Sequence, residues 1–329
     1  MKFTETLLVP DVVAADEILV LQPNQPDDLF YRQRVDRNLG WITWEEQLAL
    51  KNKTVGIAGC GGMGGALAER LLRLGVGEIR LADCENFDVS NINRQLAARR
   101  STIGKNKALE TARILRGITD DARLVVYPQG ITQQTTESFV RGCDLVCDEI
   151  EFWELSAAII LHQAARGHGI PILGCSTAGF GSHLFLFTPS SMTIEQAFGL
   201  TLEQAKQIDE GIRSGKISAG QKRKVMEMLV RVVTPALQDY CPGHNVLSKQ
   251  AILEQLLASG RAPILSTNPA LATGFIANHV LLLLLKESGI MRDAAPVPPM
   301  PGYLYLDAAK MLALTVDCKE WYHAATTFA

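Results

Sequence analysis

A glycine-rich stretch, TVGIAGCGGMGG, contains the residues whose types and spacing point most directly to nucleotide chemistry. Glycines let a turn approach a phosphate closely, and the start of the following helix offers unpaired N–H groups and a positive dipole end. Asp83 ends the next apolar run, about 20 residues further on, where an acid can bind ribose hydroxyls. These features suit ATP or a nicotinamide dinucleotide; the structural alternative is a turn that only packs a helix on a sheet. The candidate glycines are Gly59, Gly61, Gly62 and Gly64.

Polar and charged residues after Asp83 favour a nucleoside triphosphate over a dinucleotide. A triphosphate carries about four negative charges and a dinucleotide about two, and departing pyrophosphate needs cationic groups to hold it. We expect Arg94 and Lys107 to be those groups, although each taken singly is more typical of a surface ion pair or a solvated helix lysine. The sequence has no GxxxxGK[ST] motif, so it is not a P-loop protein. The other residues expected to bind the nucleotide are Glu85, Asn91 and Gln95.

Two acids in CDLVCDEIEF, Asp148 and Glu151, stand at the expected C-terminal end of a strand. Ligands of open parallel sheets bind at such ends. Mg²⁺ prefers one or two carboxylates together with phosphate oxygens. The sequence therefore predicts a magnesium site made by Glu151 and Asp148. The structural alternative is a pair of acids that offsets the dipole of the next helix.

The composition is that of an ordinary globular chain, 329 residues long, of one large or two modest domains. A formal net charge of −3 gives no overall basic field, so nucleic acid is not expected as a partner. The longest apolar run, 280–285, is too short to cross a bilayer. The N-terminal residues include acids where a signal peptide has a continuous apolar stretch. We therefore expect no association with a membrane and a cytoplasmic location. Seven cysteines without a Cys-x-x-Cys pair indicate reduced thiols and no structural zinc site.

Apolar runs of strand length alternate with helical patterns, which is typical of βαβ units. We therefore expect an α/β fold with a Rossmann-like, mainly parallel sheet flanked by helices. The expected strands lie at 54–59, 78–83, 122–127, 143–148, 170–175 and 182–187. The expected helices lie at 44–52, 62–74, 104–116, 152–166 and 270–286.

The same pattern divides the chain into four segments. Residues 1–29 contain prolines and acids and are expected to form an N-terminal arm with one edge strand. Residues 30–190 are expected to form the nucleotide-binding domain. Residues 191–262 lack strand-like runs and indicate a helical insertion. Residues 263–329 are expected to add a helix and a terminal hairpin that complete the nucleotide-binding domain.

Between residues 34 and 187 the sequence resembles the ubiquitin-activating-enzyme-like adenylating superfamily, whose bacterial members include the ThiF/MoeB-type adenylyltransferases. Arg34 and Arg37 resemble the family's Arg-x-x-Arg motif, which precedes its first helix. The glycine turn, the ribose aspartate and the Asn-x-x-Arg-Gln signature follow in the family's order. The resemblance places the phosphate lysine at Lys107 and the magnesium acid at Glu151. This ordered set of motifs covers about half of the chain and is more specific than any one of them.

The resemblance implies a reaction. ATP binds over the glycine turn of the adenylation domain, a substrate carboxylate attacks the α-phosphorus, and an acyl adenylate forms as pyrophosphate leaves. ATP and Mg²⁺ are the implied cofactors. Family members usually form homodimers in which an arginine of the first motif reaches the partner subunit's triphosphate. The implied catalytic residues are Arg37, in that role across the interface, with Arg94, Lys107 and Glu151.

Three departures from the family pattern bear on the substrate. Glu151 replaces the usual Asp and Phe152 replaces the Asn after it, the zinc motifs are missing, and no cysteine stands out as a nucleophile. The chain therefore resembles a zinc-less branch of the superfamily. That branch includes enzymes that modify tRNA-bound groups and enzymes that mature peptide natural products of the microcin C and pantocin type.

Peptide maturation is the interpretation we favour, because the arm and the helical insertion offer extra surface for a peptide. The enzyme would activate a carboxyl or amide group of a peptide or small protein, in peptide natural-product or cofactor biosynthesis. The acceptor would approach the C-terminal edge of the sheet beneath residues 175–182 and the helical insertion. The alternatives are activation of a ubiquitin-like sulfur carrier, an NAD-dependent Rossmann oxidoreductase that has no need of Arg94 or Lys107, and an inactive binding scaffold.

Overall fold

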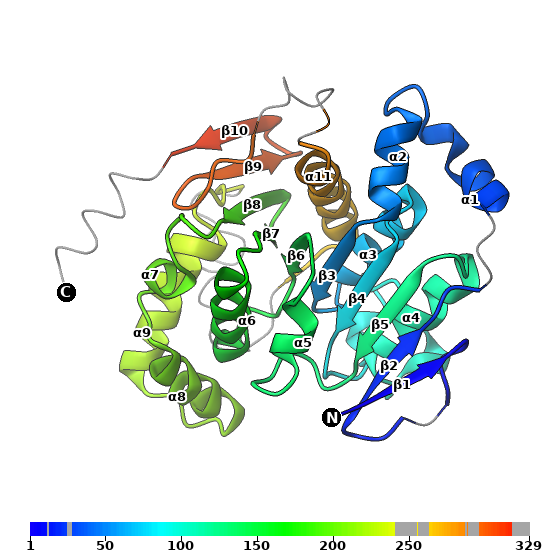
Figure 1. Cartoon of the computed structure of the whole chain (residues 1–329). Coiled ribbons are helices and arrows are strands. Elements are labelled where there is room, and N and C mark those ends of the chain that lie inside the picture. The colour runs from blue at the N-terminus through cyan, green and yellow to red at the C-terminus, as the bar shows by residue number, and fades with distance from the viewer. Residues whose placement is uncertain are drawn as a thin grey trace.

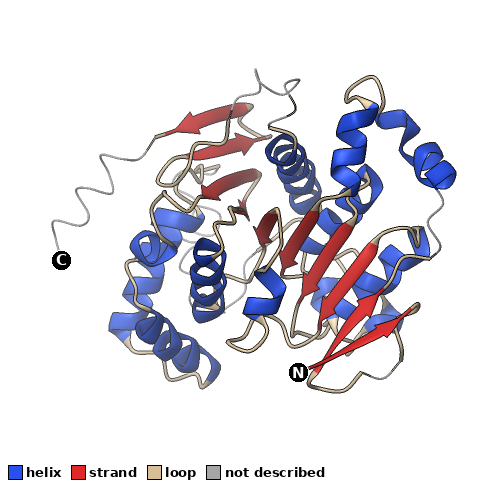
Figure 2. Ribbon diagram, viewed as in Figure 1, coloured by secondary structure: helices blue, strands red, loops and turns tan. Residues whose placement is uncertain are grey.

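The computed structural model describes residues 1–11, 13–24, 28–240, 255, 263–286, 288 and 296–317. Within these residues ten strands form one sheet, in the order β1-β2-β5-β4-β3-β6-β7-β8-β9-β10, with helices on both faces (Figures 1 and 2). Parallel pairings predominate, and they include every pairing in the centre of the sheet. The expected α/β fold with a Rossmann-like, mainly parallel sheet is therefore confirmed.

Five parallel strands make the centre of the sheet, in the order β5-β4-β3-β6-β7. From β3 the chain runs to β4 and β5, and then returns to the other side of β3 for β6 and β7, so a crevice opens between the C-terminal ends of β3 and β6. Ala58 at the end of β3 pairs with Ala82 and Asp148, which brings three strand ends to one level. The central strands are β3 (Thr54–Ala58), β4 (Glu78–Ala82), β5 (Arg123–Tyr127), β6 (Leu145–Asp148) and β7 (Ile172–Ala178).

Outer strands extend the sheet on both sides. The N-terminal arm forms two strands rather than the one expected, because KFTET pairs in parallel with β2 although most of its side chains are exposed and no apolar run marks it. On the other side β7 and β8 form a hairpin, and the expected C-terminal hairpin joins β8. The outer strands are β1 (Lys2–Thr6), β2 (Glu17–Leu21), β8 (Gly181–Phe187), β9 (Tyr303–Asp307) and β10 (Leu312–Val316).

Helices cover the two faces of the sheet, each over its own apolar core. On one face, α3, α4 and α11 bury side chains such as Leu71, Ala112 and Ile276. On the other face, α5, α6 and the helical insertion bury side chains such as Phe139 and Ile159. These helices and those of the N-terminal region are α1 (Asp28–Val35), α2 (Trp44–Lys51), α3 (Gly64–Leu74), α4 (Lys107–Ile118), α5 (Thr136–Val140), α6 (Leu155–Gly167) and α11 (Thr267–Leu284), with short 3₁₀ helices η1 (Asp36–Asn38), η2 (Val89–Asn91) and η3 (Arg100–Thr102).

Three of the expected helices begin later than the sequence predicts, at Gly64, Lys107 and Leu155. The side chain of Asn106 accepts a hydrogen bond from the Leu109 N–H and so caps the start of α4. The residues just before α3 and α6 stay outside a helix and line a cavity at the edge of the sheet. The late starts of α3 and α6 therefore leave two connecting segments at the cavity.

The α11 helix is long and apolar enough, by length and composition alone, to cross a membrane. In the structure it packs against α3 and β7, and Ala272, Ile276 and Val280 are buried there. The buried part of its apolar surface therefore packs between another helix and the sheet. The short apolar run at 280–285, which predicted no membrane span, forms the last turn of this helix and the residue after it.

The helical insertion begins with three α-helices and a π-helix, as the absence of strand-like runs predicts. At the start of each α-helix a Ser or Thr hydroxyl accepts a hydrogen bond from the N–H of a Gln three residues on, and the Gln side chain accepts one in return. The rest of the predicted insertion, residues 241–262, lies outside the described residues except for residue 255. The elements are α7 (Ile194–Phe198), α8 (Leu202–Arg213), α9 (Ala219–Met228) and the π-helix η4 (Leu229–Val233).

Asp209 on α8 connects the helical insertion to α6. Its buried carboxylate accepts hydrogen bonds from the N–H groups of Leu155 and Ser156, at 3.0 and 2.9 Å. These N–H groups lie in the first turn of α6 and have no acceptor within that helix, and a negative charge is favourable at the positive end of its dipole. Asp209 thereby fixes the start of α6 and the position of α8 together.

We predict that Asp209→Ala lowers the free energy of unfolding by about 1–2 kcal/mol, because it leaves two N–H groups without their acceptor. Chemical denaturation measures this change. Glu210→Ala is the matched control, since Glu210 is the next residue on α8 and is exposed, and its effect should stay within about 0.5 kcal/mol. Equal losses in the two variants would contradict this role of Asp209.

Candidate active site

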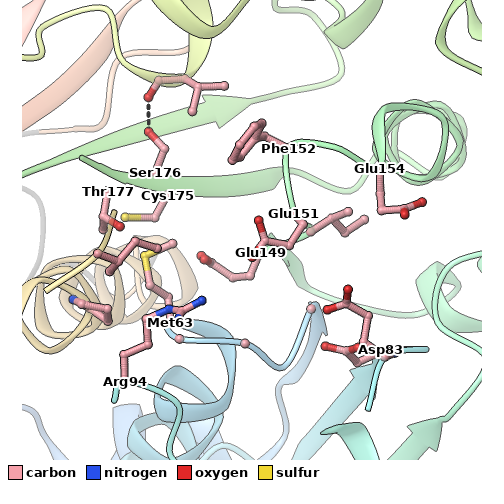
Figure 3. A pocket seen from close by; sticks show the side chains of 18 of the residues that line it. Met63, Asp83, Arg94, Glu149, Glu151, Phe152, Glu154, Cys175, Ser176 and Thr177 are labelled. Carbon is pink, nitrogen blue, oxygen red and sulfur yellow. Dashed lines mark hydrogen bonds between the residues drawn. The ribbon is translucent and has the colours of Figure 1, made fainter. Parts of the chain in front are cut away.

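A cavity lies at the C-terminal ends of β3, β4, β6 and β7, at the crevice where the strand order reverses (Figure 3). It brings together most of the residues predicted to bind nucleotide or to act in catalysis. Those that line it are Gly59, Gly61, Gly62, Asp83, Glu85, Arg94, Lys107 and Glu151. The predicted residues that do not line it are Gly64, Asn91, Gln95, Asp148 and Arg37.

The glycines of the turn have two different tasks. Gly59 has φ +99°, and a methyl group there would lie 2.1 Å from the carbonyl oxygen of Glu149. A methyl group on Gly64 would lie 1.9 Å from the carbonyl oxygen of Gly59. Gly61 and Gly62 have room for a methyl group and face the cavity. Gly59 and Gly64 therefore shape the turn, and Gly61 and Gly62 leave its backbone open to a phosphate.

Asp83 ties the glycine turn to the end of β4. Its two carboxylate oxygens accept hydrogen bonds from the backbone N–H groups of Cys60, at 2.7 Å, and Glu85, at 2.8 Å. Burial raises the pKa of the Asp83 carboxyl, and the charge of Lys107 opposes that rise. Carboxylate oxygens can each accept a further hydrogen bond, so Asp83 can also hold ribose hydroxyls from the cavity side.

Lys107 is the first residue of α4 and is only 5% exposed. Its Nζ lies 2.6 Å from a carboxylate oxygen of Glu85, which is itself half exposed. Burial alone would lower the pKa of Lys107, but the carboxylates of Asp83, Glu85 and Glu151 raise it overall. The lysine is therefore held as a cation at the cavity wall.

The three residues of the Asn-x-x-Arg-Gln signature, Asn91, Arg94 and Gln95, lie in different surroundings. Arg94 lies beside the glycine turn, with its Cγ 3.6 Å from the position of a methyl group on Gly62, and donates to the Ser90 carbonyl at 3.2 Å. Asn91 instead accepts a hydrogen bond from the Asp88 N–H at 2.9 Å and so closes the turn of η2. Gln95 is buried outside the cavity lining. Arg94 is thus the member of the signature that can contact a bound nucleotide.

The two acids predicted to hold magnesium occupy different places. Glu151 is accessible from the cavity; desolvation and the charge of Glu85 raise the pKa of its carboxyl, while Lys107 and Arg94 lower it. Asp148 lies in an adjoining apolar pocket, where one oxygen is 2.9 Å from His162 Nε2 and the other accepts from the Ile150 N–H. Glu151 therefore lies on the cationic side of the cavity, and a metal role for Asp148 stays a prediction.

The two arginines of the Arg-x-x-Arg motif, Arg34 and Arg37, also lie in different surroundings. Arg34 pairs with Asp121 at 2.6 Å and donates to the Leu72 carbonyl at 2.9 Å, which fastens α1 to the domain. Arg37 lies in η1, is exposed, and does not reach the cavity of its own subunit. A catalytic role for Arg37 would therefore require a second subunit.

Glu149 is a cavity residue that sequence reasoning missed. Both of its carboxylate oxygens are shielded from solvent, and neither has a hydrogen-bond partner among the residues that the structure describes. Burial, with a smaller contribution from Asp148, holds the pKa of Glu149 well above its ordinary value. The only sequence signal was a third acid in the run DEIE, which did not show which of the three would face the cavity.

The opposite side of the cavity is apolar and comes largely from the helical insertion. Phe152 and the end of β7 face the π-helix, whose Leu229 and Val233 line the cavity together with Leu237. The Ser176 hydroxyl on β7 donates to the Val233 carbonyl, which fixes the π-helix to the sheet (Figure 3). Of the segment 175–182, which is predicted to cover the acceptor, residues 175–179 line the cavity together with residues of the helical insertion.

The sequence matches the model of the ThiF family over residues 35–320. The chain belongs to the ThiF family. The match extends beyond the motifs of the nucleotide side and includes the helical insertion, α11 and the C-terminal hairpin. The resemblance to ThiF/MoeB-type proteins is therefore confirmed at the level of the family.

Curated relatives of this ThiF-family chain match it over part of their length. The tRNA threonylcarbamoyladenosine dehydratase of Bacillus subtilis is 43% identical over 101 residues, which are 30% of this chain and 39% of that protein. The sulfur carrier protein adenylyltransferase of Thermus thermophilus is 30% identical over 160 residues, which are 49% of this chain and 57% of that protein. The chain thus spans less than two thirds of either relative.

Among solved structures, the E. coli MccB structure with MccA-N7isoASN superposes on this ThiF-family chain with a TM-score of 0.58. The superposition covers 89% of this chain and 72% of the MccB chain, at 15% sequence identity. At that identity the likeness shows a shared fold.

We predict that Glu149→Gln raises the melting temperature of the nucleotide-free protein by about 1–3 °C at pH 8, and by less at pH 5. The pKa of Glu149 is raised in the fold, so the folded chain holds a proton that the unfolded chain has lost. Stability is therefore lost as the pH rises from the ordinary value of 4.5 toward the raised pKa, and Gln, which does not titrate, avoids this loss.

Thermal unfolding of both proteins at the two pH values measures the difference. Glu137→Gln is the control, because hydrogen bonds from Arg141 and His168 lower the pKa of that exposed carboxyl and its removal should bring no gain. A larger gain for Glu149→Gln at pH 5 than at pH 8 would contradict this account.

Proposed function

We propose that this chain is an ATP-dependent adenylyltransferase that activates a carboxyl or amide group of a peptide or small protein. The observation that carries the proposal is the gathering of the glycine turn, the acid Asp83 and the two cations Arg94 and Lys107 around one cavity. These residues come from four separate segments of the chain. A nicotinamide oxidoreductase would use the turn and the acid but has no need of the two cations.

The residues support a direct displacement at the α-phosphorus of ATP. Asp83 holds the ribose, and the backbone at Gly61 and Gly62 faces the phosphates. An oxygen of the acceptor carboxylate forms a bond to the α-phosphorus as the bond from that phosphorus to the bridging oxygen of the β-phosphate breaks. Pyrophosphate leaves with the bond's electrons, and Arg94 and Lys107 stabilise its charge. The product is a mixed anhydride, the acyl adenylate.

Glu151 fits the proposed Mg²⁺ site, because it offers a hard carboxylate on the side of the cavity where Lys107 and Arg94 act. Mg²⁺ usually takes one or two carboxylates and completes its shell with phosphate oxygens and water. The described residues contain no group of three or more His, Cys, Asp or Glu side chains placed to hold a metal by themselves. When bound, the ion would neutralise phosphate charge.

The apolar half of the cavity supports a peptide or small-protein acceptor. The π-helix and Phe152 form a wall that can receive side chains next to the carboxyl group being activated. The names of the T. thermophilus relative and of the MccB structure, a sulfur carrier adenylyltransferase and a complex with MccA, agree with acceptors of this class. We favour peptide natural-product or cofactor biosynthesis as the setting, with a sulfur carrier as the alternative acceptor and a cytoplasmic location.

We further propose a homodimer in which Arg37 completes the site of the partner subunit. Arg37 is exposed in a segment that also carries exposed apolar side chains: Trp41 is 86% exposed and Leu29 is 65% exposed. Apolar side chains exposed on this scale are common at protein interfaces. A twofold axis near this segment would bury them and bring Arg37 to the other cavity.

Lys107→Ala and Arg94→Ala should each reduce pyrophosphate release in the presence of the acceptor by about 10²–10³-fold, because each removes a preorganised cation. Lys105→Ala is the matched control, since Lys105 is exposed two residues away and should act like the unaltered protein. Calorimetry with ATP and Mg²⁺ against NAD tests the nucleotide directly. Binding of NAD with no binding of ATP would refute the proposed function.

Mixing Arg37→Ala subunits with Glu151→Ala subunits should restore activity that neither variant has alone. Each hybrid dimer contains one site in which both residues are intact, so random exchange should recover about a quarter of the original activity. Light scattering should show a dimer for each protein. A fully active monomer would rule out a role for Arg37 across the interface.

A further inference from the structure

Glu149 occupies a position in the cavity that the proposed phosphate chemistry does not use. The charges of Lys107 and Arg94 act on Glu151, whereas the charged group that acts on Glu149 is its neighbour Asp148. The Glu149 side chain points into the cavity on the side lined by Cys175 of β7 (Figure 3), and its charge acts on that thiol. Glu149 therefore faces the acceptor half of the cavity.

The described cations of the cavity are engaged elsewhere. Lys107 contacts Glu85 at 2.6 Å. Arg94 donates to the Ser90 carbonyl at 3.2 Å and to the side-chain oxygen of Asn93 at 3.0 Å. Neither gives Glu149 a hydrogen bond, and both of its oxygens lack a donor within the part of the chain that the structure describes.

Both oxygens of Glu149 are shielded and lack a donor in the empty site, and a cationic ligand that donates to them pairs with the carboxylate there. The triphosphate of ATP cannot be this ligand group, because it is an anion and is repelled by a carboxylate. Because the proposed reaction places Mg²⁺ at Glu151 and Arg37 of the partner subunit at the triphosphate, we take the acceptor as the source of the donor. An ammonium or guanidinium group offers both N–H donors and the opposite charge, which makes the strongest hydrogen bonds to a carboxylate.

We propose that Glu149 binds a positively charged nitrogen group of the acceptor, close to the carboxyl group that is activated. This inference rests on the proposed adenylation and narrows its substrate class to cationic peptides or protein ends. Side chains of Lys or Arg and a free amino terminus share this chemistry. The apolar wall at Phe152 and the π-helix then receives the uncharged part of the acceptor.

Affinity selection from defined peptide pools tests the proposal without knowledge of the natural acceptor. The protein, loaded with a non-hydrolysable ATP analogue, is incubated with three pools of tetrapeptides with free carboxyl ends, and retained peptides are identified by mass spectrometry. The first pool is N-acetylated and contains Lys or Arg. The second replaces these by norleucine or citrulline, and the third is neutral in its side chains but has a free amino terminus.

The unaltered protein should retain peptides of the first or third pool about 10–100-fold more than their counterparts in the second pool, the range expected of a hydrogen bond to a charged group. The pool retained identifies the source of the cation. Glu149→Gln should reduce this preference to about twofold or less. Glu154→Gln removes one negative charge from the same cavity at a carboxylate that already has Arg213 at 3.7 Å, and should keep the preference.

Equal retention of all three pools, retention of none, or an unchanged preference in Glu149→Gln would overturn the proposal. Binding of the ATP analogue is measured in the same samples. If the analogue binds and the peptides are not discriminated, the assignment of Glu149 fails while nucleotide use stands. If the analogue does not bind to the unaltered protein, the proposed function fails first.

Discussion

The backbone of the glycine turn touches the backbone of the segment after β6, and the rest of the site depends on this contact. No side chain fits at Gly59 or at Gly64, because a methyl group at either would overlap a carbonyl oxygen. The turn and residues 149–151 can therefore stand as facing walls of one narrow crevice. The parallel pairing of β3 with β4 and β6 brings the wall residues to one level, so Asp83 reaches the turn through the Cys60 N–H. Pairing and close approach together create a place for an anionic ligand.

Charge is distributed unevenly within this crevice. On one side Lys107, Glu85, Arg94 and Glu151 balance each other, so a triphosphate that enters meets cations already held in position. On the other side Glu149 stands without a partner in the described residues. An anionic nucleotide and a cationic acceptor would thus be drawn to opposite sides of the same cavity. That separation leaves the reacting carboxylate between them.

The helical insertion adds an apolar wall to the cavity at the edge of the sheet, and we propose that this wall receives the acceptor. Asp209 fastens α8 to the first turn of α6, and Ser176 fastens the π-helix to β7. A π-helix is rare and occurs mostly at functional sites, because its wider turn displaces side chains from the regular helical pattern. Here it directs Leu229 and Val233 into the cavity. Under the proposed function, changes in this insertion would alter the choice of acceptor and leave the proposed nucleotide side as it is.

The sequence by itself determined the fold class, and it predicted the residues of the proposed nucleotide side of the cavity. The turn, Asp83, Arg94 and Lys107 lie in short motifs next to strand ends, and the alternation of strands and helices places those ends at one edge of a sheet. The tertiary structure alone decided which of three neighbouring acids would face the cavity, and on which side of it. Asp148 turns to His162, Glu149 to the cavity beside Cys175, and Glu151 to the cations, because the chain leaves β6 without entering a helix until Leu155. Side-chain direction in such a segment depends on contacts with residues distant in sequence, which no local pattern contains. For the same reason, no local pattern predicted the role of Asp209, the π-helix wall or the exposed strand β1. Residues distant in sequence determine where each of them lies.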